Sequence, residues 1–157
     1  MISQLRLNNE LKIMNNADYS DIFTAKIIND NILTWEIILN GPQSSLYDGY
    51  MFKLLMEIPN NYPNTPPKVK FITPIKHLNV NLDGDICLNI LKNDEWMPSL
   101  TIPSIIISIV SLLSDPNPDD PLNSELCQKY RSSPETYKKE ILEYCHTYAM
   151  QILNNYE

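Results

Sequence analysis

Hydrophobic residues alternate with polar ones, or form short runs, in four segments of the N-terminal half: residues 22–28, 32–39, 50–58 and 68–72. Runs of this length and composition predict β-strands. The segments NDN and GPQSSLYDG between them have hairpin lengths and contain turn residues, which predicts an antiparallel meander. The prolines of PNNYPNTPP exclude a helix and a central strand, so the fourth strand is expected to be short and edge-like.

Helical spacing appears at the N-terminus and again after residue 100. Mixed three- and four-residue spacings predict a first helix over residues 2–14, with an apolar face formed by Ile2, Leu5, Leu11 and Met14. Thr101 is expected to cap a very apolar helix that ends near Ser114, with Pro103 in its first turn.

The same signals predict a last helix that begins with Pro134 and is capped by Ser133. Its apolar stripe consists of Ile141, Tyr144, Cys145, Tyr148 and Ile152. Strands followed by helices predict an α+β fold, in which helices pack on one sheet. Residues 73–100 show no periodicity and are long for a connection, which is typical of a functional loop.

The composition narrows the classes of protein. A chain of 157 residues predicts one domain over residues 1–157. The net charge of -7, with no basic block, argues against nucleic acid as a partner. No apolar run is long enough for a signal peptide or a membrane span, so an intracellular protein is expected. Three cysteines without a CxxC pair predict reduced thiols, with no disulfide framework and no metal site.

One of these cysteines, Cys87, lies in the long loop, within HLNVNLDGDICLNIL. Its neighbours Ile86 and Leu88 favour an inert, packed thiol, because cysteine packs like a small hydrophobic residue. The turn at residues 83–85 favours an accessible loop position instead. His77 could activate the thiol or could form structural hydrogen bonds, and the residues alone leave both questions open.

The helix predicted to end near Ser114 has one broad aliphatic face and one face of serines, Ser104, Ser108, Ser111 and Ser114. Ile107 lies among the serines. A single exposed apolar residue usually has no function, but an uncharged surface centred on an isoleucine also suits docking of another protein.

Five motifs point to a known family: GPQSSLYDG, YPNTPPKVKF, HLNVNLDGDICLNIL, WMPSL and DPNPDDPLN. In this order and spacing they closely resemble the ubiquitin-conjugating enzymes, and the resemblance covers essentially the whole chain. It implies a four-stranded antiparallel sheet flanked by about four helices. It also implies that Cys87 accepts ubiquitin as a thioester from an activating enzyme and passes it to a substrate lysine, usually with a ligase. No cofactor is expected on the chain, because the upstream activating enzyme uses the ATP.

The resemblance assigns further residues near the thiol. Asn79 matches an asparagine implied to stabilise the oxyanion, although a role in holding the loop backbone is the alternative. Asp120 matches the carboxylate implied to orient and deprotonate the incoming lysine. The positions implied to shape the groove and position the lysine are Asn89, Asn117 and Leu122.

Partner contacts follow from the same resemblance. Ile107 and Ser111 match positions that contact the donor ubiquitin, and Arg6 matches a contact to the activating enzyme. A RING-type ligase is expected to dock on two loops, through Pro63 and Asn64 in the first and Met97, Pro98 and Ser99 in the second. The implied location is the cytoplasm or nucleus of a eukaryotic cell, or of a host cell if a virus encodes the protein.

The sequence departs from the family pattern at three positions. Leu78 replaces a proline, Asn89 replaces a common aspartate, and Asn64 replaces the phenylalanine of broadly ligase-compatible members. We expect activity to survive the first change, lysine attack to be less assisted after the second, and ligase partners to be few or unusual after the third. Two alternatives stay open: a conjugating enzyme for another ubiquitin-like modifier, and a non-catalytic ubiquitin-binding module of the same fold.

Overall fold

The structure is a computed structural model that describes residues 2–92 and 94–152. Its main elements, in chain order, are α1 (Ile2–Met14), β1 (Phe23–Ile28), β2 (Asn31–Asn40), β3 (Tyr50–Glu57), β4 (Lys68–Phe71), α2 (Ile102–Ser114), α3 (Ser124–Ser132), α4 (Pro134–Tyr148) and β5 (Met150–Gln151). Two short 3-10 helices, η1 (Ala17–Tyr19) and η2 (Asn89–Leu91), complete the list. Within the described residues, no helix is both long enough and apolar enough to cross a membrane.

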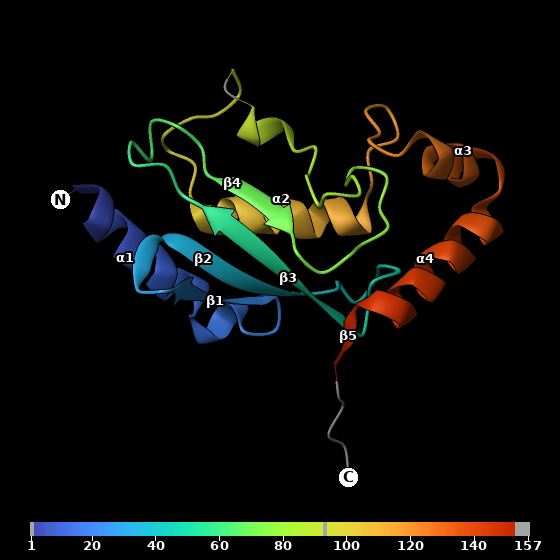
Figure 1. The fold of residues 1–157 in the computed structure, drawn as a ribbon, viewed down its shortest axis with the longest axis horizontal. Coiled ribbons are helices and arrows are strands. Elements are labelled where there is room, and N and C mark those ends of the chain that lie inside the picture. The colour runs from blue at the N-terminus through green and yellow to red at the C-terminus, as the bar shows by residue number, and fades with distance from the viewer. Residues whose placement is uncertain (1, 93, 153–157) are drawn as a thin grey trace, which may run out of the picture.

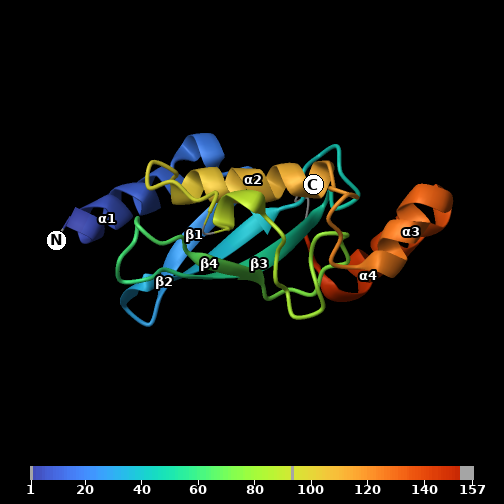
Figure 2. The same ribbon diagram turned by 90° about the horizontal axis from the view of Figure 1, so that it is seen from above.

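The sheet is an antiparallel meander in the order β1-β2-β3-β4, and the two-residue β5 pairs with the start of β3. Alternating side chains bury one face of its central strands, with Trp35, Ile37 and Leu39 from β2 beside Phe52, Leu54 and Met56 from β3. Figures 1 and 2 show α2 lying across one face of the sheet, while α3 and α4 lie together at the end opposite the N-terminus. The α+β fold with a four-stranded meander and four helices is therefore confirmed.

Helix α2 follows the sequence prediction closely. The Thr101 side chain accepts a hydrogen bond from the Ser104 N–H, and the Ser104 hydroxyl lies 2.9 Å from the Thr101 nitrogen, which completes a capping box. The aliphatic face is buried through Ile102, Ile105, Ile106, Ile109 and Leu113. Full burial of one such aliphatic side chain stabilises the fold by about 1.5–3 kcal/mol, so this face fixes α2 on the sheet.

Other helix predictions were wrong in part. In α1 the buried face is formed by Leu7, Glu10 and Met14, whereas Leu5 is 65% exposed. The buried face was predicted wrongly because it contains Glu10. A prediction based on the spacing of apolar residues alone does not include a buried glutamate. The Ser133 side chain makes no capping hydrogen bond, although Pro134 does begin α4. Helix α4 ends at Tyr148, so Ile152 lies beyond its stripe and donates its N–H to the Gly49 carbonyl.

The pattern of apolar residues did not predict helix α3. Only Leu126 and Cys127 are buried in its nine residues, which is too few for a clear stripe. The Asn123 side chain caps it by accepting a hydrogen bond from the Leu126 N–H. The resemblance had implied a fourth helix without locating it, and α3 supplies it.

Candidate active site

The Cys87 thiol follows a tight turn that ties its loop to the sheet. Gly84 adopts a φ of 87°, and a Cβ there would lie 2.0 Å from the Phe71 carbonyl oxygen, so the position requires glycine. The Gly84 carbonyl accepts the Phe71 N–H, and the Asn81 side chain accepts the N–H groups of Asp83 and Asp85. The turn therefore fixes the loop against β4 three residues before the cysteine.

The thiol of Cys87 is half-buried and donates a hydrogen bond to the Asp120 carboxylate, with 3.2 Å between Sγ and Oδ2. Lys92 Nζ lies 3.6 Å from the same oxygen. Burial raises the pKa of the Cys87 thiol, the Asp120 hydrogen bond and charge raise it further, and the Lys92 charge lowers it in part. The thiol is accessible but is not held as a thiolate.

Asn79 is 1% exposed and uses its whole side chain to hold the loop that carries Asp120. Its Nδ2 donates to the carbonyl oxygens of Asn117 (2.8 Å) and Asp120 (3.1 Å), and its Oδ1 accepts the Asn117 N–H (2.9 Å). Both amide hydrogens therefore have partners, and neither is free to face an oxyanion at Cys87. This geometry favours the loop-holding alternative, while the oxyanion role stays a prediction.

His77 is buried, and both of its ring nitrogens are occupied. Nδ1 accepts the Asn79 N–H at 2.9 Å, which leaves Nε2 as the protonated nitrogen that donates to the Leu112 carbonyl at 2.8 Å. Burial lowers the pKa of His77 to about 4. The histidine is thus neutral and structural in this arrangement, and its hydrogen bonds do not involve the thiol of Cys87.

Leu78 lies between these two residues and is fully buried. Its carbonyl accepts the N–H groups of Leu122 (2.8 Å) and Asn123 (3.2 Å). Leu78 lacks the fixed φ angle of a proline. Its position is held instead by burial of its side chain and by two backbone hydrogen bonds to the facing loop. We call residues 77–79 with their hydrogen-bond partners the anchor.

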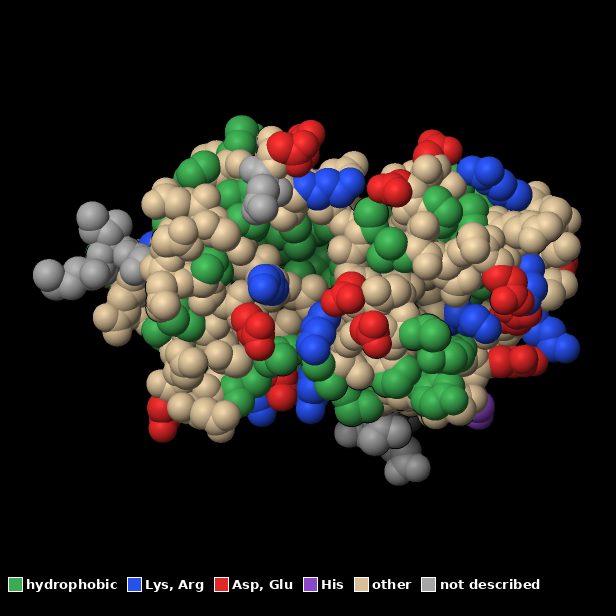
Figure 3. All heavy atoms as spheres, turned by 45° about the horizontal axis from the view of Figure 1, so that its top comes forward, with side chains coloured by type: hydrophobic (Ala, Val, Ile, Leu, Met, Phe, Trp, Pro, Cys, Tyr) green, Lys and Arg blue, Asp and Glu red, His purple; other side chains and the backbone are tan. Residues whose placement is uncertain are grey.

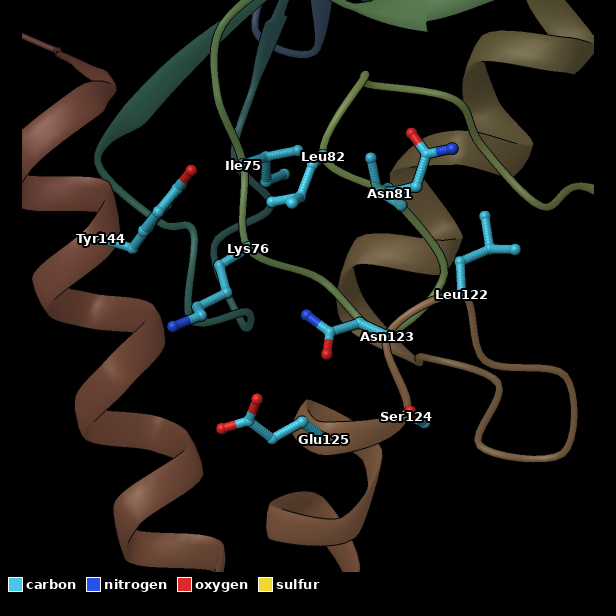
Figure 4. A pocket seen from close by; sticks show the side chains of 10 residues that line it. Ile75, Lys76, Asn81, Leu82, Leu122, Asn123, Ser124, Glu125 and Tyr144 are labelled. Atoms are coloured by element: carbon cyan, nitrogen blue, oxygen red, sulfur yellow. The ribbon is translucent and has the colours of Figure 1, made fainter.

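The predicted groove residues come from η2 and from the loop that carries Asp120. Asn89 is exposed in the first turn of η2, and Asn117 contacts Asn79 through its backbone. Leu122 is partly exposed and lines a cavity of about 420 Å³. Figure 4 shows this cavity between the segment of Ile75 and Lys76, the segment from Leu122 to Glu125, and α4. Cys87 is not among its lining residues, so this cavity is not the pocket of the thiol.

Comparisons with known proteins identify the family of this site. The sequence model described as ubiquitin-conjugating enzyme matches residues 6–145. The chain is also 51% identical over 146 residues to a probable ubiquitin-conjugating enzyme E2 of Acanthamoeba polyphaga mimivirus, and the alignment covers 92% of each chain. The chain belongs to the ubiquitin-conjugating enzyme family. The membership predicted from the five motifs is confirmed, and the protein is an enzyme of the E2 class, a transferase.

The two loops predicted to bind a ligase lie side by side in this conjugating enzyme. Trp96 donates its indole N–H to the Pro63 carbonyl at 2.7 Å, which joins the first loop to the second. Asn64 and Met97 are exposed, as are Pro98 and Ser99 beside them. The loops thus form one surface, and its use by a ligase stays a prediction.

Arg6 points into the molecule rather than out of it. Its guanidinium donates to the carbonyls of Pro98 (2.7 Å) and Leu100 (2.6 Å) and pairs with Glu10 at 2.7 Å. Glu10 in turn accepts the Tyr62 hydroxyl and the Ile102 N–H at the start of α2. Arg6 therefore fixes the second of these two loops to α1, and its predicted contact with an activating enzyme is untested.

On α2, Ile107 is partly exposed and Ser111 is exposed, as their places on the serine face predict. Contact with a donor ubiquitin stays a prediction for both.

Two residues that hold or line the site of this conjugating enzyme, Glu10 and Lys92, were not predicted from the sequence. Glu10 had a signal, because it lies three residues after Leu7 and four before Met14 on one helical face. Lys92 had none, since nothing distinguishes its sequence context from that of other exposed lysines.

Proposed function

We propose that this enzyme accepts ubiquitin from an activating enzyme as a thioester on Cys87 and transfers it to a lysine amine. The observation that carries the proposal is the half-exposed Cys87 Sγ, 3.2 Å from the Asp120 carboxylate, on a loop whose backbone is fixed on both sides. Cys127 and Cys145 are buried, and burial raises the pKa of Cys145 to about 11. Neither offers an accessible sulfur for a modifier.

Charging is a thioester exchange. The thiolate of Cys87 attacks the carbonyl of a thioester on the activating enzyme, whose own cysteine leaves as the thiolate. This step does not require a strongly lowered pKa of Cys87. The attacking group and the leaving group are both thiolates, so the free energies of the two thioesters are nearly equal. A raised pKa of Cys87 suits such an enzyme, since a less acidic thiol is a poorer leaving group and keeps the bound modifier longer before transfer.

Discharge requires an amine in the correct place. A free lysine has a pKa near about 10.4, so an incoming lysine arrives as an ammonium ion. Asp120 is partly exposed and attracts that ion to within reach of the thioester. We assign Asp120 the positioning of the lysine, while loss of the proton depends on desolvation in the groove. We assign Asn79 the task of holding Asp120 in place, through the three hydrogen bonds of its side chain.

The test mixes the protein with ATP, an activating enzyme and ubiquitin, and looks for an adduct that reductant removes. Cys87→Ser should convert this adduct into an ester that resists reductant, because oxygen replaces sulfur as the acyl carrier. Cys127→Ser is the matched control and should keep the labile adduct. A labile adduct that persists in Cys87→Ser would move the function to another cysteine.

Two alternatives are outcomes of the same assay. A labile adduct with another ubiquitin-like modifier and its activating enzyme, but not with ubiquitin, would change the cargo. No adduct with any modifier would leave a non-catalytic ubiquitin-binding module. The proposed partners are ubiquitin, an activating enzyme, a ligase of RING type and lysine-bearing substrates. The proposed location is the cytoplasm or nucleus of a eukaryotic cell, or of a host cell if a virus encodes this protein as one encodes its 51% identical relative.

A further inference from the structure

A single carboxylate oxygen at the thiol site contacts two other groups. Asp120 Oδ2 accepts a hydrogen bond from the thiol of Cys87, with 3.2 Å to Sγ, and lies 3.6 Å from Lys92 Nζ. In the part of the chain that the structure describes, no other group forms a hydrogen bond or an ion pair with the Asp120 carboxylate or with the Lys92 amine. Lys92 thus occupies the position that the proposed mechanism gives to the ammonium ion of an incoming lysine.

Charging of the enzyme changes these contacts. A thioester on Cys87 has no S–H group, so the Asp120 carboxylate loses its thiol donor when a modifier is attached. The ion pair with Lys92 is then the contact that remains. Asn89, two residues after Cys87, is neutral, and the pair formed by Asp120 and Lys92 has no net charge. An acceptor ammonium ion therefore meets the full negative charge of Asp120 only after Lys92 has moved away.

The backbone of Lys92 is held in place while its side chain is free to move. Its N–H donates to the Asn89 carbonyl at 3.1 Å, and its own carbonyl accepts the N–H of the buried Trp96 at 2.8 Å. The Lys92 side chain is 50% exposed and that of Asp120 is 56% exposed. Figure 3 shows charged side chains of both signs on the rim of a hollow with hydrophobic side chains at its bottom. An exposed ion pair corresponds to no more than about a fivefold preference for the paired state, so an acceptor amine can displace Lys92.

We infer that Lys92 is a built-in competitor of the acceptor amine: its ammonium group occupies the place beside Asp120 that a substrate lysine must take, and the substrate lysine must displace it before transfer. The inference rests on the proposed thioester function of Cys87. Lys92 is thus a positioning residue that acts through Asp120. It raises the apparent KM for the acceptor and leaves the chemical step unchanged, because a competitor that has moved away no longer affects the bound amine.

The charge of Lys92 has the opposite effect on the charging step. It lowers the pKa of Cys87 in part, against the burial and the Asp120 carboxylate that raise this pKa. A lower pKa gives more of the thiolate that attacks the thioester of the activating enzyme. Lys92 therefore favours charging and hinders discharge, which gives a reason for a cation at a site that must bind a second one.

The experiment charges the full chain with ubiquitin, stops charging, and adds free lysine at several concentrations and constant ionic strength. The rate of formation of the ubiquitin–lysine product is measured at low lysine and at its plateau. Lys92→Gln removes the charge, so it should raise the rate at low lysine about threefold and leave the plateau rate unchanged. Lys92→Arg keeps a cation beside Asp120 and should retain the rates of the unaltered chain.

A matched control tests whether any lost surface charge has this effect. Lys138 lies exposed on α4 and lines a different cavity. Lys138→Gln removes the same charge as Lys92→Gln but leaves the pair at Asp120 intact, so it should retain the unaltered rates. A threefold gain in Lys138→Gln or in Lys92→Arg would overturn the inference.

Two further measurements distinguish competition from a simple opening of the site. In a chain that carries Asp120→Asn, Lys92→Gln should give no gain, because the carboxylate for which the two amines compete is absent. Hydroxylamine, which is uncharged near neutral pH, should discharge the Lys92→Gln enzyme and the unaltered enzyme at the same rate. A gain that persists without the carboxylate, or that is equally large with hydroxylamine, would overturn the inference.

The result separates this inference from the proposed function. A reductant-labile adduct whose discharge to lysine is no faster in Lys92→Gln would overturn the inference and leave the thioester function standing. Absence of the labile adduct from the unaltered chain would overturn the thioester function, and the inference with it.

Discussion

The anchor and the thiol site lie beside each other but are built in opposite ways. In the anchor, the side chains of His77, Leu78 and Asn79 are almost completely buried, and those of the two polar residues are fully hydrogen-bonded. At the thiol site, Cys87 is half-buried, while Lys92 and Asp120 are about half exposed and share one weak ion pair. The anchor therefore fixes the positions of the loops. The charged groups of the thiol site can exchange partners, as a transfer reaction requires.

The largest effect should come from removing the amide of the anchor. Asn79→Ala deletes three partly buried hydrogen bonds and leaves the Asn117 N–H without an acceptor, so it should lower the free energy of unfolding by about 3 kcal/mol. Urea denaturation measures this. Asn117→Ala is the control, because Asn117 contacts Asn79 through backbone atoms only, and it should cost less than about 1 kcal/mol. Similar losses in both variants would contradict the assignment of Asn79 as the holder of the loop.

A second, smaller effect on the free energy of unfolding should come from protonation of His77 in the anchor. The pKa of His77 is lowered to about 4 in the folded state, whereas an unfolded histidine titrates near about 6.5. Between these values the unfolded chain binds more protons, so the stability contributed by neutral His77 is fully present above about pH 6.5 and is lost as the pH falls toward 4. Unfolding free energies should fall by about 1.5 kcal/mol between pH 6.5 and 5 from this group alone.

The control for this effect is a side chain that does not titrate. His77→Gln keeps a donor and an acceptor and should flatten the decline over the same interval, whereas His146→Gln, on an exposed part of α4, should preserve it. An equal decline in His77→Gln would show that another group causes it.

The sequence predicted the fold wherever burial followed the apolar pattern. The alternation in β2 and β3 and the Thr101 cap of α2 led to the right elements, because hydrophobic periodicity and capping are local signals. The pattern failed where polar groups are buried or apolar ones are few. Glu10 replaced Leu5 on the inner face of α1, and α3 has only two buried side chains.

The candidate site was named by resemblance, and its geometry was not predictable from local sequence. Asn79 meets Asn117 and Asp120, which lie 38 and 41 positions away along the chain. Residue types alone could not choose between the oxyanion and loop-holding roles of Asn79, since an amide serves either one. The acceptors of the Asn79 amide hydrogens decide which role the geometry favours, and these acceptors come close to Asn79 only in the folded chain.

The smallest effect on stability, with a clear effect on rate, should come from the thiol site. Asp120→Ala removes an exposed side chain, so it should change the free energy of unfolding by less than about 0.5 kcal/mol. Its loss also removes a charge that raises the pKa of Cys87, so charging should be as fast as in the unaltered enzyme or somewhat faster. Discharge to free lysine should slow about tenfold, equivalent to about 1.4 kcal/mol of barrier.

Asp119 provides the matched control, because its carboxylate is a more exposed neighbour that pairs with Arg131 instead. Asp119→Ala should discharge at the unaltered rate. Timed loss of the labile adduct after addition of lysine measures both variants. Equal rates would remove Asp120 from the positioning of the amine, whereas a large loss of stability in Asp120→Ala would mean that this carboxylate belongs with the anchor and that the two regions are not separate in function.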